Sequence, residues 1–226
     1  MWRYVVIGCC GLGLPATAQA EDVSLSFGAT IASEYVSSGI RYTDGIVAQP
    51  FVEVGFGAFY AGAYASNLNR GLTGARTEYG LSAGYRGALD RFSYDVGVAF
   101  YAYDEVSGLV PVEDYAETYA SGTFAVTDRV FATASAAIAP EFDQTNLSLR
   151  ADHDTAFEGL SVGAEFGRFD ASFGTWNYWS VDTSYAVSES LSLGLAYHDT
   201  DVDPALGLFA TDGLFVASLS LAFSLR

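Results

Sequence analysis

The residues of this 226-residue chain that could do chemistry are isolated acids and arginines set among serine, glycine and alanine. In stretches such as FSYDVGVAFY, at 92–101, bulky apolar residues recur at every second position and the charge falls between them. A period of two sends successive side chains to opposite faces of a strand, so each charge lies on the small, polar face. The candidates on that face are Glu34, Glu53, Arg76, Glu78, Arg86, Asp95, Glu117, Arg150, Asp152, Glu165 and Asp182.

These eight acids and three arginines predict ion pairs with a surplus of negative charge. A charge in a narrow interior is costly unless it is paired or hydrated, so the arginines should lie among the carboxylates. Arg76 and Glu78 beside Asp95 and Glu117 make one expected cluster. Two interpretations stay open: the network lines a hydrated channel that favours cations, or it interlocks as a plug. The inward tyrosines that would fill such a plug are Tyr60, Tyr64, Tyr101 and Tyr119.

Catalysis is a third class, and its one candidate centre is His198. Beside Asp199 and Asp201, this histidine could act as a base oriented by a carboxylate. The chain contains no G-x-S-x-G and no H-E-x-x-H motif, so no nucleophile or metal accompanies the histidine. We therefore expect a histidine at a loop edge, no enzyme activity, no metal site and no cofactor.

The elements that must position these charges are strands. Twelve segments alternate between apolar and polar residues, and each is close to the roughly 9–11 residues that a tilted strand needs to cross a bilayer. They are Val23–Tyr35, Ile46–Phe56, Phe59–Asn67, Ala75–Arg86, Phe92–Tyr103, Tyr115–Val126, Val130–Ala139, Leu147–Asp154, Leu160–Gly167, Trp176–Val187, Leu191–Asp199 and Leu214–Leu225. The pattern predicts an all-β, membrane-spanning, antiparallel up-and-down β-barrel of about twelve strands.

The connections between these segments support the same architecture. Short turns such as ALDR and SES alternate with longer polar stretches such as SSGIRYTDG, NLNRGLTG, RFDASFG and DTDVDPALGLFATDG. Outer-membrane barrels have short turns at the periplasmic side and longer loops outside. The polar face carries mostly serine, glycine and alanine, as in a crowded barrel interior, whereas the alternative, a secreted sandwich, would present more lysine and glutamate to water.

The N-terminus reads MWRYVVIGCCGLGLPATAQA, which has the form of a cleaved secretory signal peptide over residues 1–20. Residues 21–226 are then one barrel domain. Both cysteines lie in the signal segment, so the mature chain has no thiol chemistry. A formal net charge of −17 argues against binding nucleic acid.

Aromatic residues near the expected outer ends of the strands predict an interface girdle rather than a surface for binding sugars. They are Tyr35, Tyr103, Tyr115, Trp176, Tyr178 and Trp179. The acidic stretches YHDTDVDP and VPVEDY match no defined calcium loop, and we interpret them as a solvated rim.

The stretch IASEYVSSGIRYTDGIVAQPFVEVGFGAFYAGAYASNL resembles the Gcw_chp family of exported proteobacterial proteins of unknown function. The resembling positions are Ser33-Glu34-Tyr35, Ser38-Gly39-Ile40, Thr43-Asp44-Gly45, Gln49-Pro50, Phe59-Tyr60-Ala61-Gly62 and Ala65-Ser66-Asn67. The chain departs from the family pattern at Ser38, where an arginine is usual. The resemblance implies an outer-membrane β-barrel and brings no known substrate.

These observations lead to a passive, cation-preferring outer-membrane channel for small solutes as the expected function. The expected partners are outer-membrane lipid and lipopolysaccharide, with small solutes or cations in the lumen, and no oligomeric state is predicted. The alternative is a structural or surface barrel without an open pore, whose acidic loops serve adhesion or divalent-bridged contact with lipopolysaccharide.

Overall fold

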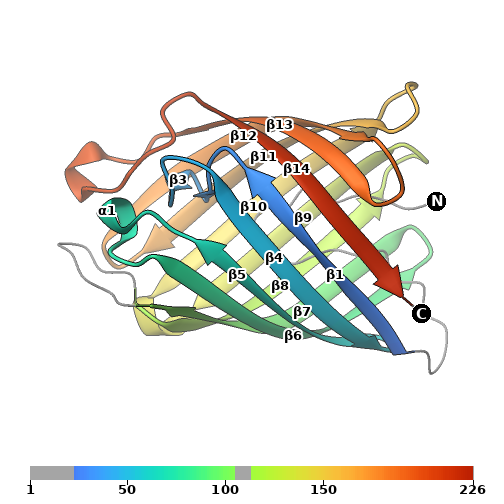
Figure 1. Ribbon diagram of the computed structural model, residues 1–226, viewed down its shortest axis with the longest axis horizontal. Coiled ribbons are helices and arrows are strands. Elements are labelled where there is room, and N and C mark those ends of the chain that lie inside the picture. The colour runs from blue at the N-terminus through green and yellow to red at the C-terminus, as the bar shows by residue number, and fades with distance from the viewer. Residues whose placement is uncertain (1–22, 105–112, 226) are drawn as a thin grey trace.

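Twelve strands form one closed antiparallel barrel in the computed structural model, which describes residues 23–104 and 113–225. Each strand pairs with the next barrel strand along the chain, and the first, β1, also pairs with the last, β14 (Figure 1). The predicted fold class is therefore confirmed. The expected signal peptide, residues 1–20, lies outside the described residues.

The barrel strands match the twelve predicted segments, with differences confined to their ends. Their bounds are β1 Val23–Ala32, β4 Val47–Phe56, β5 Phe59–Asn67, β6 Thr77–Leu89, β7 Phe92–Tyr103, β8 Tyr115–Ala125, β9 Val130–Ala139, β10 Gln144–Asp154, β11 Leu160–Ala171, β12 Gly174–Ala186, β13 Leu191–Thr200 and β14 Leu214–Leu225. The stretch RFDASFG, expected as a loop, is mostly strand because β11 and β12 stay paired as far as Ala171 and Gly174.

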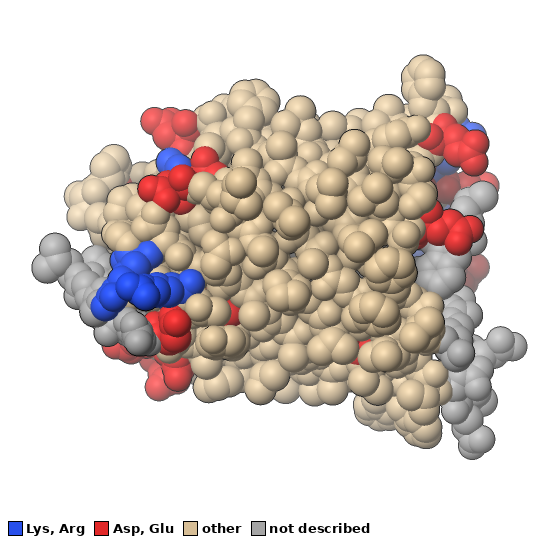
Figure 2. Space-filling model, viewed as in Figure 1, with Lys and Arg blue, Asp and Glu red and all other residues tan. Residues whose placement is uncertain are grey.

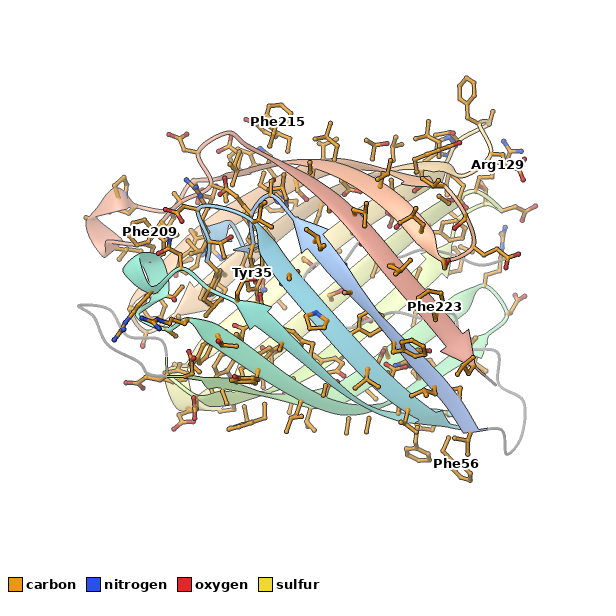
Figure 3. The ribbon with its side chains drawn as sticks, in the orientation of Figure 1. Tyr35, Phe56, Arg129, Phe209, Phe215 and Phe223 are labelled. Carbon is orange, nitrogen blue, oxygen red and sulfur yellow. The ribbon has the colours of Figure 1, made fainter. Side chains whose placement is uncertain are left out.

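Large apolar side chains cover the outer face of the barrel. Ile31, Leu149 and Val181 are 50%, 66% and 57% exposed, and they alternate with residues that face inward. Phe56 and Phe215 project beyond the outline of the ribbon in Figure 3, and Phe223 is exposed on the same outer face. The charges visible in Figure 2 gather at the two ends and leave a broad band between them almost without charge.

Hydroxyl pairs line the inner side of the seam that closes the barrel. Ser26 Oγ lies 2.6 Å from Ser224 Oγ, and Thr30 Oγ1 lies 2.8 Å from Ser220 Oγ. Such cross-strand pairs add side-chain hydrogen bonds to the backbone ladder between β1 and β14. The small polar residues of the sequence pattern therefore face the interior and take part in closure.

The two ends of the barrel differ in the length of their connections. One end, here called the long-loop end, carries the connections 33–46, 68–76 and 201–213; the other, the short-turn end, carries short turns and the ends of the described chain at Val23 and Leu225 (Figure 1). The long-loop end also holds the short elements β2 Val36–Ser37, β3 Ile40–Arg41, α1 Arg70–Thr73, η1 Pro140–Phe142 and η2 Pro204–Leu206. No helix among residues 23–104 and 113–225 is long and apolar enough to cross a membrane.

Inward tyrosines lie against the barrel wall because each faces a glycine on the neighbouring strand. Tyr64 is paired with Gly80, and a Cβ added to that glycine would come within 2.0 Å of the Tyr64 ring. Tyr60 has the same relation to Gly84, and Tyr119 to Gly97. Each ring thus occupies the space that a side chain on the adjacent strand would need. These three rings therefore lie along the wall of the barrel.

We expect Gly80→Ala to lower the free energy of unfolding by about 1–3 kcal/mol, because the added methyl group forces the Tyr64 ring out of its place. Urea titration of the refolded barrel in lipid vesicles measures this loss. In a Tyr64→Leu background the same substitution should cost much less, since the clashing ring is gone. An equal loss in both backgrounds would contradict the packing argument.

Candidate functional site

Arg86 organises a first polar cluster on the wall formed by β4 to β7. Its Nη2 donates to Glu53 Oε2 at 2.7 Å, and its Nε lies 3.9 Å from Asp95 Oδ2. The guanidinium carbon stands 3.6 Å from the centre of the Tyr60 ring. Tyr60 in turn donates its hydroxyl hydrogen to Asp95 Oδ1 at 2.6 Å and contacts the hydroxyl of Tyr119. The arginine is held by two carboxylates and an aromatic face.

Arg150 organises a second cluster on the facing wall, β10 to β12. Its Nη1 and Nη2 donate to the two carboxylate oxygens of Asp182 at 2.7 and 3.0 Å, a bidentate pair. Asp152 accepts from Arg150 Nε at 3.0 Å, and Glu165 Oε2 lies 4.0 Å from Nη1. One guanidinium therefore neutralises part of the charge of three carboxylates that come from three adjacent strands.

Glu78 lies nearer the long-loop end and is held by tyrosines. Its Oε1 accepts the hydroxyl hydrogen of Tyr35 at 3.0 Å and also that of Tyr64, while Oε2 accepts from Tyr103 at 2.8 Å. The residue is only 2% exposed. Three hydroxyl donors satisfy this buried carboxylate, as burial of a polar group requires.

The charged residues expected inside the barrel are mostly there. The expected acids that face inward are Glu53, Glu78, Asp95, Glu117, Asp152, Glu165 and Asp182, and the expected arginines that do so are Arg86 and Arg150. Glu117 accepts the Tyr101 hydroxyl hydrogen at 3.0 Å. The inner wall thus carries more negative than positive charge.

Two of the expected lumenal charges are placed differently. Arg76 is exposed just before β6, and its backbone N–H donates to Asp104, so the expected cluster of Arg76 with Glu78 does not form. The strand alternation that would direct Arg76 inward begins only at Thr77. Glu34 belongs to the connection after β1, where it pairs with Arg41 at 2.7 Å.

That connection turns back into the mouth of the barrel. Its hairpin, formed by β2 and β3 over Val36–Arg41 and here called the inward hairpin, turns at Ser38 and Gly39, whose φ angles are 49° and 79°. The Ser38 carbonyl accepts from Trp176 Nε1 at 2.7 Å, and Ser38 Oγ accepts from Asn146 Nδ2 at 2.8 Å. Since Asn146 and Trp176 lie on the inner faces of β10 and β12, the tip of the hairpin contacts the far wall.

Five of the six aromatic residues expected in an interface girdle lie inside instead. Tyr35 and Trp176 are 5% and 3% exposed, Tyr103 bonds to Glu78, and Tyr115 stacks on Tyr101 at 4.8 Å. Tyr178 donates to Asn146 Oδ1 at 2.8 Å. The reason is strand parity. Trp176 and Tyr178 are an even number of residues from the inward Asp182, and Tyr103 and Tyr115 have the same relation to Asp95 and Glu117. Only Trp179, 37% exposed, faces outward.

Neither Asp199 nor Asp201, the carboxylates closest to His198 in the sequence, is oriented toward its imidazole ring. Asp199 accepts from the Tyr197 hydroxyl at 3.0 Å on the opposite side of β13. Asp201 accepts from the side-chain and backbone nitrogens of Asn177, and these hydrogen bonds lower the pKa of the Asp201 carboxyl. The alternative considered from the sequence, a base oriented by one of these two carboxylates, is therefore not assembled. Among residues 23–104 and 113–225, no group of three acids or histidines is arranged to hold a metal ion.

Comparison with known proteins gives a family and a fold. A family model described as "Bacterial protein of unknown function (Gcw_chp)" matches residues 16–223. The fold is similar to the structure described as "KdgM porin", with a TM-score of 0.60, 10% identity and coverage of 90% of this chain and 99% of that one. "KdgM porin in complex with disordered oligogalacturonate" gives a TM-score of 0.58 at 10% identity, covering 90% and 98% of the two chains. A NanC porin gives 0.54 at 9% identity, covering 89% and 99%. Comparison with curated proteins finds no match.

We expect Arg150→Met to destabilise the barrel by about 3 kcal/mol, because three carboxylates would lose the cation they share. The matched control is Arg129→Met, which removes an exposed arginine from a turn at the short-turn end and should change stability by less than about 0.5 kcal/mol. Urea unfolding in vesicles measures both. Equal losses from the two variants would show that the Arg150 ion pairs add nothing to the free energy of unfolding beyond what an exposed arginine adds.

Proposed function

The chain belongs to the Gcw_chp family of bacterial proteins of unknown function, and from that membership and its porin-like fold we propose that it is an outer-membrane barrel through which small solutes diffuse. The observation that carries the proposal is the division between the two faces of the barrel. Apolar side chains cover the outside, while ion pairs and hydroxyl groups line the inside. In water alone, an exposed apolar band of this extent would promote aggregation.

The proposed surroundings of the barrel follow from the same division. Lipid hydrocarbon covers the uncharged band, and the long-loop end, where charges gather, faces lipopolysaccharide outside the cell. The expected signal peptide over residues 1–20 would supply the export that this location requires. In this proposal the protein has no catalytic role and needs no cofactor.

We propose a preference for cations because seven of the acids expected inside the barrel face the inner wall, against two of the expected arginines. Wall charge of one sign attracts ions of the other sign in a narrow, water-filled passage. One of the similar structures is a complex of KdgM with oligogalacturonate, a chain of acidic sugars. A wall with surplus negative charge is unsuited to such a polyanion, so we propose cations and small uncharged solutes for this chain.

A barrel without an open pore is the second candidate, and the inward hairpin is the observation that favours it. The hairpin crosses the mouth between opposite walls. If it closes the passage, the function of the protein resides in its surface, with the acidic loops used for adhesion or for divalent-bridged contact with lipopolysaccharide.

Single-channel recording of the refolded protein in a planar bilayer, with a KCl gradient, tests both candidates. The channel proposal expects discrete current steps and a reversal potential of the sign that marks K⁺ as the more permeant ion. A barrel that inserts correctly, as judged by heat-modifiable electrophoretic mobility, and stays silent would overturn the channel proposal in favour of the second candidate.

We expect Glu53→Gln combined with Glu117→Gln to lower the ratio of K⁺ to Cl⁻ permeability by roughly a factor of two, through the loss of wall charge. The change at Glu53 acts twice, because it also leaves Arg86 less neutralised. The reversal potential in the KCl gradient measures the ratio. Glu158→Gln, at an exposed turn of the short-turn end, is the matched control and should leave the ratio unchanged. An unaltered ratio in the double variant would remove these two carboxylates from the selectivity argument.

A further inference from the structure

We propose that the inward hairpin, Val36–Arg41, is the size filter of this protein, and that selection by charge takes place separately, at the arginine clusters deeper in the lumen. The inference deepens the proposed channel function and rests on it. It follows from where the hairpin is attached, how firmly it is held, and which chemical groups surround its tip.

The hairpin divides the mouth because its attachments lie on opposite walls. On one side, the adjoining Tyr35 donates its hydroxyl hydrogen to Glu78 on β6. On the other side, Ser38 contacts Asn146 on β10 and Trp176 on β12. In the order of strands around the barrel, β10 is five strands from β1 and six from β4, which makes it the strand opposite the root of the hairpin. Figure 3 places Tyr35 within the outline of the barrel.

Further contacts hold the tip of the hairpin to the connection between β13 and β14. The Gly39 carbonyl accepts from Thr211 N at 3.0 Å, Arg41 N donates to the Phe209 carbonyl at 2.8 Å, and Ile40 forms a β-bridge with Ala210. A solute entering from the long-loop end therefore meets backbone that is bonded to fixed elements on three sides.

Apolar packing holds the hairpin at both ends. Tyr35, Val36 and Tyr42 belong to a cluster with Ala32 and Val47 at the root. Near the tip, Ile40 packs against a second cluster whose buried members are Phe169, Ala171, Trp176, Tyr178 and Val202. Because these contacts bury apolar groups away from water, displacing the hairpin costs free energy. The hairpin is therefore a fixed obstacle.

Gly39 fits the tip against the far wall because it has no side chain. Its φ of 79° favours glycine, and a Cβ there would lie 2.8 Å from both Tyr178 Cβ and Thr200 Cβ. Gly45, in the same connection, has no atom within 4 Å of its added Cβ, and its φ lies outside the left-handed region. A larger residue at position 39 should force the tip away from β12, whereas one at position 45 should not.

The groups at the tip of the hairpin carry no net charge. Ser38, Asn146, Trp176 and Tyr178 are uncharged, and the one arginine of the hairpin, Arg41, is paired with Glu34. By contrast, Glu53, Arg86 and Asp95 each lie three residues from the end of their strand at the short-turn end. The arginine clusters thus lie away from the tip of the hairpin, so a change confined to the hairpin should alter the size limit without altering the selection by charge.

The test compares Gly39→Val with the matched control Gly45→Val in planar bilayers. We expect Gly39→Val to raise single-channel conductance by about a factor of two and to admit larger neutral polyethylene glycols, with the K⁺/Cl⁻ reversal potential unchanged. Gly45→Val should behave as wild type. Heat-modifiable mobility and circular dichroism confirm that each barrel has folded.

Trp176→Phe gives a second route, since it removes the Nε1 donor to Ser38 and keeps an aromatic ring against Phe169. We expect a smaller rise in conductance of the same kind. Ser38→Arg, in contrast, places a cation at the tip of the hairpin, and it should both reduce conductance and move the reversal potential toward Cl⁻.

The outcomes separate the size filter from the channel itself. A conducting wild type whose conductance and polymer limit are unchanged in folded Gly39→Val and Trp176→Phe would overturn the size filter and leave the channel intact. A silent wild type with a conducting Gly39→Val would support the hairpin as the barrier while overturning the open channel. Silence in both folded proteins would overturn the hairpin as the barrier.

Discussion

Closure of the sheet by the pairing of β1 with β14 is the constraint on which the rest of the structure depends. A barrel in hydrocarbon must satisfy every backbone N–H and C=O within its own ladder, and a single open edge would leave a row of them without partners. Once the sheet is closed, successive side chains of each strand point either to the outer face of the barrel or into its lumen. The same rule that exposes Ile31 and Leu219 to the outside sends Thr30 and Ser220 to the inside, where they bond across the seam.

Closure also brings the inward carboxylates close together in the lumen. Two arginines each neutralise several of them. Arg86 serves two carboxylates and Arg150 three, while Glu78 relies on tyrosine hydroxyl groups. The two shortest contacts between strands, Arg86 to Glu53 and Arg150 to Asp182, each reach across one intervening strand, from β6 to β4 and from β10 to β12, so ion pairing on the inner side links strands that are not neighbours in the sheet. The acids that remain in excess give the lumen its negative sign, so the same residues link the stability of the barrel to the selectivity proposed for it.

The strands were predictable from sequence because alternation is a local property, and all twelve segments were found in this way. The same alternation, followed through β12 from Asp182, would have placed Trp176 and Tyr178 inside; assigning them to a girdle by their closeness to the strand ends was wrong. The inward hairpin could not be predicted from the sequence, for a different reason. Ser38 meets Asn146 and Trp176 across 108 and 138 residues of chain, and no local pattern encodes such a contact.

The pairing of inward tyrosines with glycines has a consequence for how the strands find their alignment. A slip of two residues between β5 and β6 would keep every side chain on its proper face, so alternation alone does not forbid it. It would, however, set Tyr64 opposite Ser82 or Glu78 in place of Gly80, and Tyr60 opposite Ser82 or Arg86 in place of Gly84. Neither ring could then lie against the wall. The tyrosine–glycine pairs therefore fix the register of β5 against β6, which the alternation of apolar and polar residues leaves open to shifts of two residues.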